Sequence, residues 1–203
     1  MRKFYLFVGA LLVLVLVACQ TGQPGEATGL DEFLEAGGAH LEAGEYAGAV
    51  ADLEAAVEID PDSSEARFLL GQAYNRTGEL LKAADEFRAV LDLDPDNAAA
   101  HHNLGVTYFQ LQDPGTAIAE FKAALELDPD DPDTHYQLGA TYLVLALPGG
   151  GAMTSLDPQL LEQAVAEFEV ALDLEEDMPE ALIGLGNVYI QQADYAAAIE
   201  VLQ

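Results

Sequence analysis

Residues 70–74 read LGQAY and residues 104–108 read LGVTY, so one five-residue motif recurs after 34 residues. It returns as LGATY at residues 138–142 and as LGNVY at residues 185–189. A motif that recurs at a period of this size predicts a repeat architecture. Each unit of such an architecture is too small to bury its own core and must stack on its neighbours.

Other residues keep the same 34-residue period. Asp-Pro steps stand at 60–61, 94–95 and 128–129. Each unit holds two segments with the apolar spacing of an amphipathic helix, separated by a glycine or a polar turn, and a proline follows the second segment. The pattern predicts five pairs of helices, at residues 31–43 with 46–58, 65–77 with 79–92, 98–111 with 114–126, 132–145 with 158–173, and 179–192 with 195–203.

In period, residue type and order, these units resemble the tetratricopeptide repeat over residues 30–203. The tryptophan that the family often carries in its first helix is absent. The resemblance implies an all-α fold, a right-handed superhelical solenoid of about five helix-turn-helix units of which the last is incomplete. The units would occupy residues 30–63, 64–97, 98–131, 132–178 and 179–203.

The fourth unit carries an insertion. Tyr108 lies nine residues before Ala117, whereas the equivalent Tyr142 lies 22 residues before Ala164. The 13 extra residues fall within 146–158, where three consecutive glycines disfavour regular structure. We expect the insertion to project from one edge of the solenoid, either as part of a binding edge or as an exposed loop that is free to vary.

The fifth unit stops inside its second helix, at Gln203. Solenoids need a polar cap on their outer face, and Ala198, Ile199 and Leu202 are expected to have no covering helix. The sequence therefore predicts either that the array continues in a longer reading frame or that a partner meets it at this end.

The first 19 residues read MRKFYLFVGALLVLVLVAC. Two basic residues precede an apolar stretch, Phe4 to Val17, that is too short to span a bilayer comfortably, which predicts a signal peptide over residues 1–18. Its end, Leu16-Val17-Ala18-Cys19, resembles the lipobox of bacterial lipoproteins, and Cys19 is the only cysteine in the chain.

The lipobox resemblance implies a lipid on Cys19 after cleavage of the leader. Residues 19–29 would then form the lipidated cysteine and a flexible linker that contains little to bury. We expect a membrane-anchored bacterial lipoprotein on the extracytoplasmic side, at the outer membrane and its periplasmic face or at the cell surface.

The chain is strongly acidic. It has 36 acidic and 7 basic residues and a formal net charge of −29. This balance argues against nucleic acid as a partner, because phosphate binding requires a basic face. It leaves a well-solvated surface, a basic partner or adaptation to high salt as interpretations.

The resemblance places a ligand groove on the first helix of each pair. The expected groove is largely apolar with a few amides, which favours an apolar or amphipathic peptide segment. It lacks the lysines of the family's carboxylate clamp, and packing between helices is the alternative for any one of its side chains. The candidate groove residues are Leu34, Leu41, Phe68, Gln72, Asn75, His102, Val106, Phe109, Tyr136, Leu143, Ile183, Asn187 and Ile190.

No motif for catalysis, metal or cofactor binding is complete. Asp92, Asp94 and Asp96 resemble the start of a calcium loop, but Asn97 and Asn103 stand where that loop needs glycine and glutamate. The four histidines lack the spacing of a helical metal pair. The sequence predicts a lipid-anchored protein–protein interaction scaffold or adaptor rather than an enzyme. The alternatives are the docking part of a larger enzyme or transport or assembly protein, and a receptor for a soluble ligand.

Overall fold

The computed structural model describes residues 27–148 and 156–203, and within them the chain forms helices and no strands. The helices alternate as the first and second members of five pairs. They are α2 (Ala27–Ala43), α3 (Tyr46–Ile59), α4 (Ser64–Thr77), α5 (Leu80–Leu93), α6 (Ala98–Gln110), α7 (Pro114–Leu127), α8 (Pro132–Ala146), α9 (Pro158–Leu174), α10 (Pro179–Gln191) and α11 (Tyr195–Val201).

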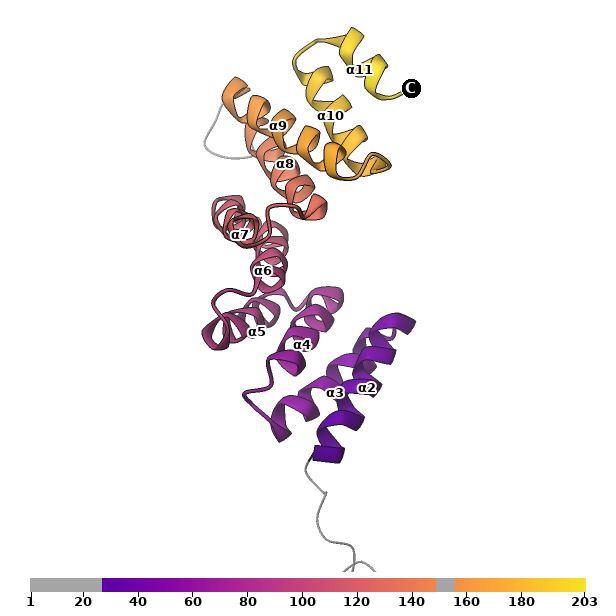
Figure 1. The fold of residues 1–203 in the computed structure, drawn as a ribbon, viewed down its shortest axis with the longest axis vertical. Helices are drawn as coiled ribbons and strands as arrows, with labels where there is room; N and C mark the ends of the chain where they lie inside the picture. Colours follow the sequence, from indigo (N-terminus) through magenta and orange to yellow (C-terminus); the bar gives the residue numbers. More distant parts are fainter. Residues whose placement is uncertain (1–26, 149–155) are drawn as a thin grey trace, which may run out of the picture.

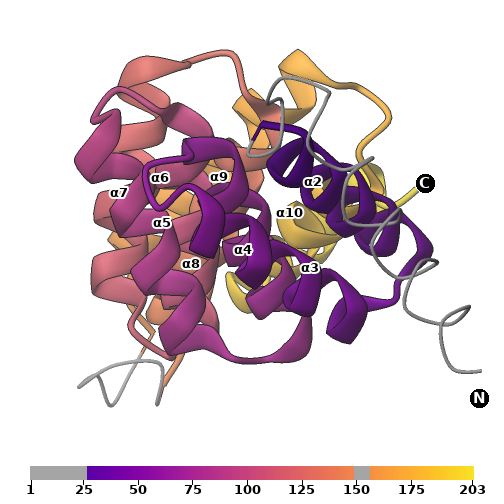
Figure 2. The same ribbon diagram turned by 90° about the horizontal axis from the view of Figure 1, so that it is seen from below.

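The pairs stack in chain order along the long axis, from α2 and α3 at one end to α10 and α11 at the other (Figure 1). Seen along that axis, the helices wind around one another rather than forming a flat row (Figure 2). Among the described residues, first helices of successive units contact each other but second helices do not. The first helices therefore line the inner side of the curve, and the expected all-helical solenoid is confirmed.

The observed helix ends lie within two residues of the expected ones, apart from the start of α2. That helix begins at Ala27, so the end of the segment expected to be a linker is helical. Residues 27–29 hold no proline, and Gly29 packs beside α3, because a Cβ on it would lie 3.5 Å from Ile59 Cδ1. The expected signal peptide, Cys19 and most of the linker lie outside the described residues.

The repeated Asp-Pro steps end one helix and begin the next. Asp94 follows α5, and its carboxylate accepts a hydrogen bond from the N–H of Asp96 at 3.3 Å, which forms the turn. Asn97 then caps α6 by accepting from the N–H of Ala100 at 2.9 Å. The same turn recurs around Asp60 and Asp128. Asp94, one of the aspartates first compared with a calcium loop, therefore has a structural role in the turn.

One glycine in every first helix faces a bulky side chain of the second helix in its unit. A Cβ added to Gly105 would lie 2.7 Å from Phe121, whose side chain is fully buried. Such a distance is too short for a real contact, so only glycine lets the two helices approach this closely. The equivalent pairs are Gly37 with Leu53, Gly71 with Phe87, Gly139 with Phe168 and Gly186 with Leu202.

A tyrosine in each first helix from the second unit to the fourth contacts a charged residue of the preceding unit. Tyr74 donates a hydrogen bond to Glu54 at 2.5 Å, and burial together with that bond raises the pKa of Tyr74. The guanidinium of Arg88 lies 5.5 Å from the ring centre of Tyr108. These contacts join neighbouring units.

The insertion lengthens the fourth helix pair instead of forming only a loop. Helix α8 runs four residues past Tyr142, and α9 begins six residues before Ala164. The added residues bury Ala146 and place Leu160 against the same core, and the N–H of Asp157 donates to the carbonyl of Ala146 at 3.1 Å. Residues 149–155 lie outside the described part of the chain, so the expected projecting edge is untested there.

The end of the array is only partly as expected. Ile199 and Leu202 are 58% and 51% exposed, whereas Ala198 is buried at 4%. The expectation that Ala198 would be uncovered was wrong, because this small side chain faces the interior of its own helix pair. None of the helices in the described ranges has the length and apolar character that a membrane span requires.

The glycine contact leads to a direct test. We predict that Gly105→Ala lowers the free energy of unfolding by about 1–3 kcal/mol, because the new methyl group meets the ring of Phe121, which cannot move away. Urea unfolding followed by far-ultraviolet circular dichroism measures the loss.

The matched control is Gly115→Ala, in the exposed first turn of α7. Its Cβ would lie 3.7 Å from the nearest atom, on Asp113, which is an ordinary contact. Alanine there should leave stability unchanged or raise it by up to about 1 kcal/mol. Equal effects of the two substitutions would show that close packing at Gly105 is not the constraint.

Candidate functional site

A hollow of about 710 Å³ lies along the inner side of the solenoid, between the first helices of the first four units. Helices α2, α4, α6 and α8 supply its walls, with one residue from the start of α3. The lining residues are Leu41, Glu42, Tyr46, Gln72, Asn75, Arg76, His102, Asn103, Val106, Gln110 and Gln137.

The structure brings some of the candidate groove residues to this hollow and places the others elsewhere. Those at the hollow are Leu41, Gln72, Asn75, His102 and Val106. Side chains that pack instead against the buried core are Leu34, Phe68, Phe109, Tyr136 and Leu143. Exposed residues of the last unit, outside the hollow, are Ile183, Asn187 and Ile190.

Aromatic packing explains why part of the expected stripe turns away from the hollow. Phe68 lies three residues before Gly71, and its ring meets that of Phe87 edge-on with centroids 5.7 Å apart. The ring of Tyr136 meets that of Phe168 in a tilted arrangement, with centroids 6.0 Å apart. Each of these first-helix rings covers the ring that the glycine admits, so it belongs to the core.

Most of the lining residues that sequence reasoning missed lie one place after a candidate residue on the same helix, and Tyr46 at the start of α3 is the exception. Asn103 and Gln137 follow His102 and Tyr136, and Arg76 follows Asn75. One residue turns the side chain by about 100° around a helix, which moves Gln137 from the core-facing position of Tyr136 to the inner side. A polar stripe next to the apolar one was the signal that could have found them.

The hollow is polar, so the expectation of a largely apolar groove was wrong for this part of the molecule. Five lining residues carry a carboxamide, and only Leu41 and Val106 are aliphatic. Asn75 is already bound, because its amide donates to the hydroxyl of Thr107 at 2.9 Å. Gln72, Gln110 and Gln137 make no side-chain hydrogen bond within the described part of the chain, so their carboxamides are available to a ligand.

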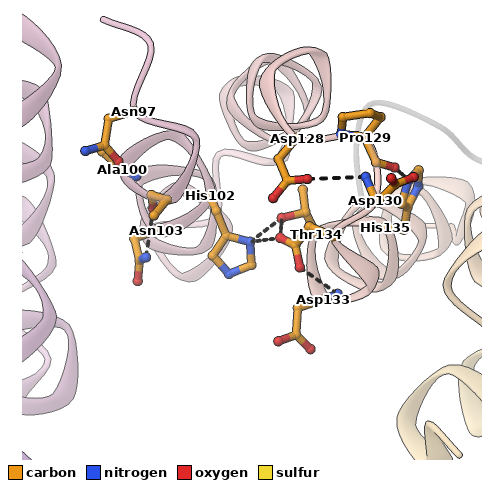
Figure 3. A network of polar contacts seen from close by, with 12 residues as sticks. Asn97, Ala100, His102, Asn103, Asp128, Pro129, Asp130, Asp133, Thr134 and His135 are labelled. Carbon is orange, nitrogen blue, oxygen red and sulfur yellow. Dashed lines mark hydrogen bonds and ion pairs between the residues drawn. The ribbon is translucent and has the colours of Figure 1, made fainter. Parts of the chain in front are cut away.

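His102 stands at the centre of a polar network that connects the hollow to the next unit (Figure 3). Its Nδ1 lies 2.5 Å from the hydroxyl oxygen of Thr134. Thr134 donates its own proton to Asp131, so it must accept from His102, which fixes the proton on Nδ1. Asp131 in turn accepts from the N–H of Asp133 at 3.2 Å and caps α8.

Burial lowers the pKa of His102, against the opposing influence of Asp131 and Asp133. The ring is therefore neutral near pH 7, and its Nε2 carries a lone pair. Figure 3 shows this nitrogen pointing away from Thr134. Since His102 lines the hollow, Nε2 offers a hydrogen-bond acceptor among the carboxamides.

A smaller cavity of about 210 Å³ adjoins the hollow and shares His102 and Asn103 with it. Asp128, Asp131 and Asp133 line its other side. Within residues 27–148 and 156–203, no group of three or more histidine, cysteine or acidic residues is arranged to hold a metal ion. The arrangement as a whole can accept and donate hydrogen bonds along a bound chain segment.

Because burial disfavours the charged form of His102, we predict that the free energy of unfolding contains a contribution that is lost at acid pH. Because the folded chain disfavours the imidazolium, the unfolded chain binds that proton more tightly, so this component of stability falls as the pH drops below the ordinary histidine range near ~6.5. We expect the stability of the wild-type chain to fall relative to that of His102→Gln between about pH 7 and about pH 5.

Urea midpoints of the two chains, measured side by side at each pH, provide the comparison. The other three histidines are present in both chains, so their contributions cancel. Parallel curves over this pH range would contradict the assigned state of His102.

Comparisons with known proteins agree with the architecture. Two family models, both described as tetratricopeptide repeat, match the chain, one at residues 34–98, 82–132 and 159–203 and the other at residues 120–156. No curated protein sequence matches the chain closely enough to count as a relative.

Several solved structures share the fold. A MamA crystal structure is 19% identical with a TM-score of 0.70, over 86% of this chain and 88% of that one. MamA from residue 41 to its end, from Desulfovibrio magneticus, is 21% identical with a TM-score of 0.71, over 85% and 90%. PilF of Pseudomonas aeruginosa is 23% identical with a TM-score of 0.72, over 87% and 75%. At these identities the likeness concerns the fold alone. The family models, which together span the array from residue 34 to residue 203, show that the chain belongs to the tetratricopeptide repeat family.

Proposed function

We propose that the chain holds a partner protein by seating an extended segment of it in the hollow of the first four units. Membership in the tetratricopeptide repeat family supports a protein–protein interaction scaffold. The observation that carries the finer proposal is the row of unengaged carboxamides on three successive first helices, Gln72, Gln110 and Gln137.

A carboxamide matches a peptide bond, because it donates through its NH₂ group and accepts through its oxygen. Side chains on α4, α6 and α8 can therefore pair with successive peptide groups of an extended segment. Recognition of this kind reads the main chain of the ligand and places few demands on its side chains. Leu41 and Val106 add limited apolar contact, so the segment need not be strongly apolar.

The proposal includes an anchor and a location. The lipobox resemblance at Leu16-Val17-Ala18-Cys19 supports a lipid on Cys19, which would hold the array at the extracytoplasmic face of a bacterial membrane. The linker after Cys19 would keep the hollow clear of the bilayer. In this arrangement the protein acts by holding and positioning its partner, with no catalytic step.

The hollow is tested by removing two carboxamides without changing side-chain length. The double variant Gln72→Met and Gln137→Met should recover about tenfold less partner from solubilised bacterial envelope than the wild-type chain, because it loses hydrogen bonds worth about 1.4 kcal/mol or more in total. Quantitative mass spectrometry of captured proteins gives the ratio.

Gln163→Met, on the exposed side of α9, is the matched control and should recover the same partner as the wild-type chain. Undiminished recovery by the double variant would show that the partner does not bind in the hollow.

The anchor is tested separately with Cys19→Ser. We expect this variant to lose incorporated radiolabelled fatty acid and to leave the membrane fraction, because serine has no thiol to accept the lipid. Thr21→Ser, two residues away, should retain both properties. A Cys19→Ser chain that is still lipidated would exclude the proposed anchor.

A further inference from the structure

The same polar contact recurs at the start of the first helix in the second, third and fourth units. A basic side chain at one repeat position reaches backward to the carbonyl of the proline in the preceding turn and sideways to a glutamate of the following second helix. We call this three-member contact a turn clamp. It fixes the turn between two units onto the helix pair that follows.

Arg67 forms the first turn clamp. Its Nε donates to the carbonyl of Pro61 at 2.6 Å, and its Nη1 donates to Oε2 of Glu86 at 2.7 Å. The guanidinium carries several N–H groups and stays protonated at every physiological pH, so both contacts are made at once.

His101 forms the second turn clamp at the equivalent position. Its Nδ1 lies 2.7 Å from Oε2 of Glu120, and its Nε2 lies 3.3 Å from the carbonyl oxygen of Pro95. The side chain is 19% exposed, and the glutamate is 22% exposed. The contact with Glu120 is therefore partly shielded from bulk water, whereas the contact with Pro95 is exposed.

His135 repeats the arrangement one unit later. Its Nδ1 lies 2.7 Å from Oε2 of Glu167. Its Nε2 lies 3.1 Å from the carbonyl oxygen of Pro129 (Figure 3). The imidazole is 13% exposed. In the part of the chain that the structure describes, each of these two histidines forms an ion pair with that one carboxylate alone.

A carbonyl oxygen and a carboxylate can only accept hydrogen bonds, so each ring must donate from both nitrogens to complete its turn clamp. A neutral imidazole has one N–H, and the imidazolium has two. We propose that the turns before the third and fourth units are clamped only when His101 and His135 are protonated, so that these two joints tighten as the pH falls and loosen as it rises. The turn before the second unit, clamped by Arg67, has no such dependence.

The direction follows from proton linkage. The imidazolium donates to both acceptors of its turn clamp and the neutral imidazole to only one, so acidification adds a hydrogen bond that the unfolded chain lacks and favours folding. The other two histidines must be held constant in the test. His40 lies between Asp52 at 2.8 Å and Glu45 at 3.4 Å, and buried His102 responds in the opposite sense.

Exchange between arginine and histidine at the shared position isolates the turn clamps in the full chain. The double variant His101→Arg and His135→Arg replaces two titrating clamps by permanent ones, for which the first turn provides the geometry. Arg67→His does the reverse. Urea unfolding at about pH 8 and about pH 5.5, followed by circular dichroism, gives the pH dependence of each chain.

We expect the double variant to lose part of the acid-dependent stabilisation of the wild-type chain, by roughly fivefold per turn clamp in the unfolding equilibrium constant, and Arg67→His to gain a similar amount. The control variant Gln163→Arg with Gln191→Arg adds the same charge at exposed positions and should keep the pH dependence of the wild type. Unchanged pH dependence in Arg67→His, or in a folded double variant, would overturn the proposal. The outcome is independent of whether the hollow binds a partner.

Discussion

The contact between a glycine of each first helix and a bulky side chain of the second helix determines the rest of the structure. It sets how closely the two helices of a unit approach, since a single methyl group at Gly105 would overlap the ring of Phe121. The residue three places before the glycine then covers that ring, as Phe68 covers Phe87. This packing uses one stripe of the first helix for the core, and the next stripe lines most of the hollow, which His102 also reaches from the core stripe.

The turns between units combine several functions in few residues. Asp94 ends one helix, Asn97 begins the next, and the carbonyl of Pro95 between them accepts from His101. Their spacing is fixed by the need for a capped end, a capped start and an acceptor aimed at the following helix. The acidic and polar residues that dominate these turns therefore stabilise the joints directly and also keep the surface soluble.

The 34-residue period made the helix pairs predictable. Each Asp-Pro step marks the end of a helix, and the glycine that recurs in each first helix marks where the two helices of a unit approach closely. The start of α2 was missed because residues 27–29 carry no boundary signal of their own. The hollow was predicted only in part, since the choice between two adjacent stripes depends on ring packing, and the sequence pattern does not specify which stripe the rings take. His102 was identified as a groove residue, but its partner Thr134 lies 32 residues away, and only the stacked units bring the two together.

The lengthened fourth pair has a consequence for the assembly of the array. Units built from one repeated motif have similar helices, so a helix could pair with the wrong neighbour during folding and form a compact but incorrect stack. The residues that lengthen α8 bury Ala146, and Leu160 in the added start of α9 packs against the same core, only when these two helices meet. Any other pairing would leave an apolar turn uncovered. The insertion thus distinguishes the correct order of units from competing ones and reduces the frustration that sequence repetition creates.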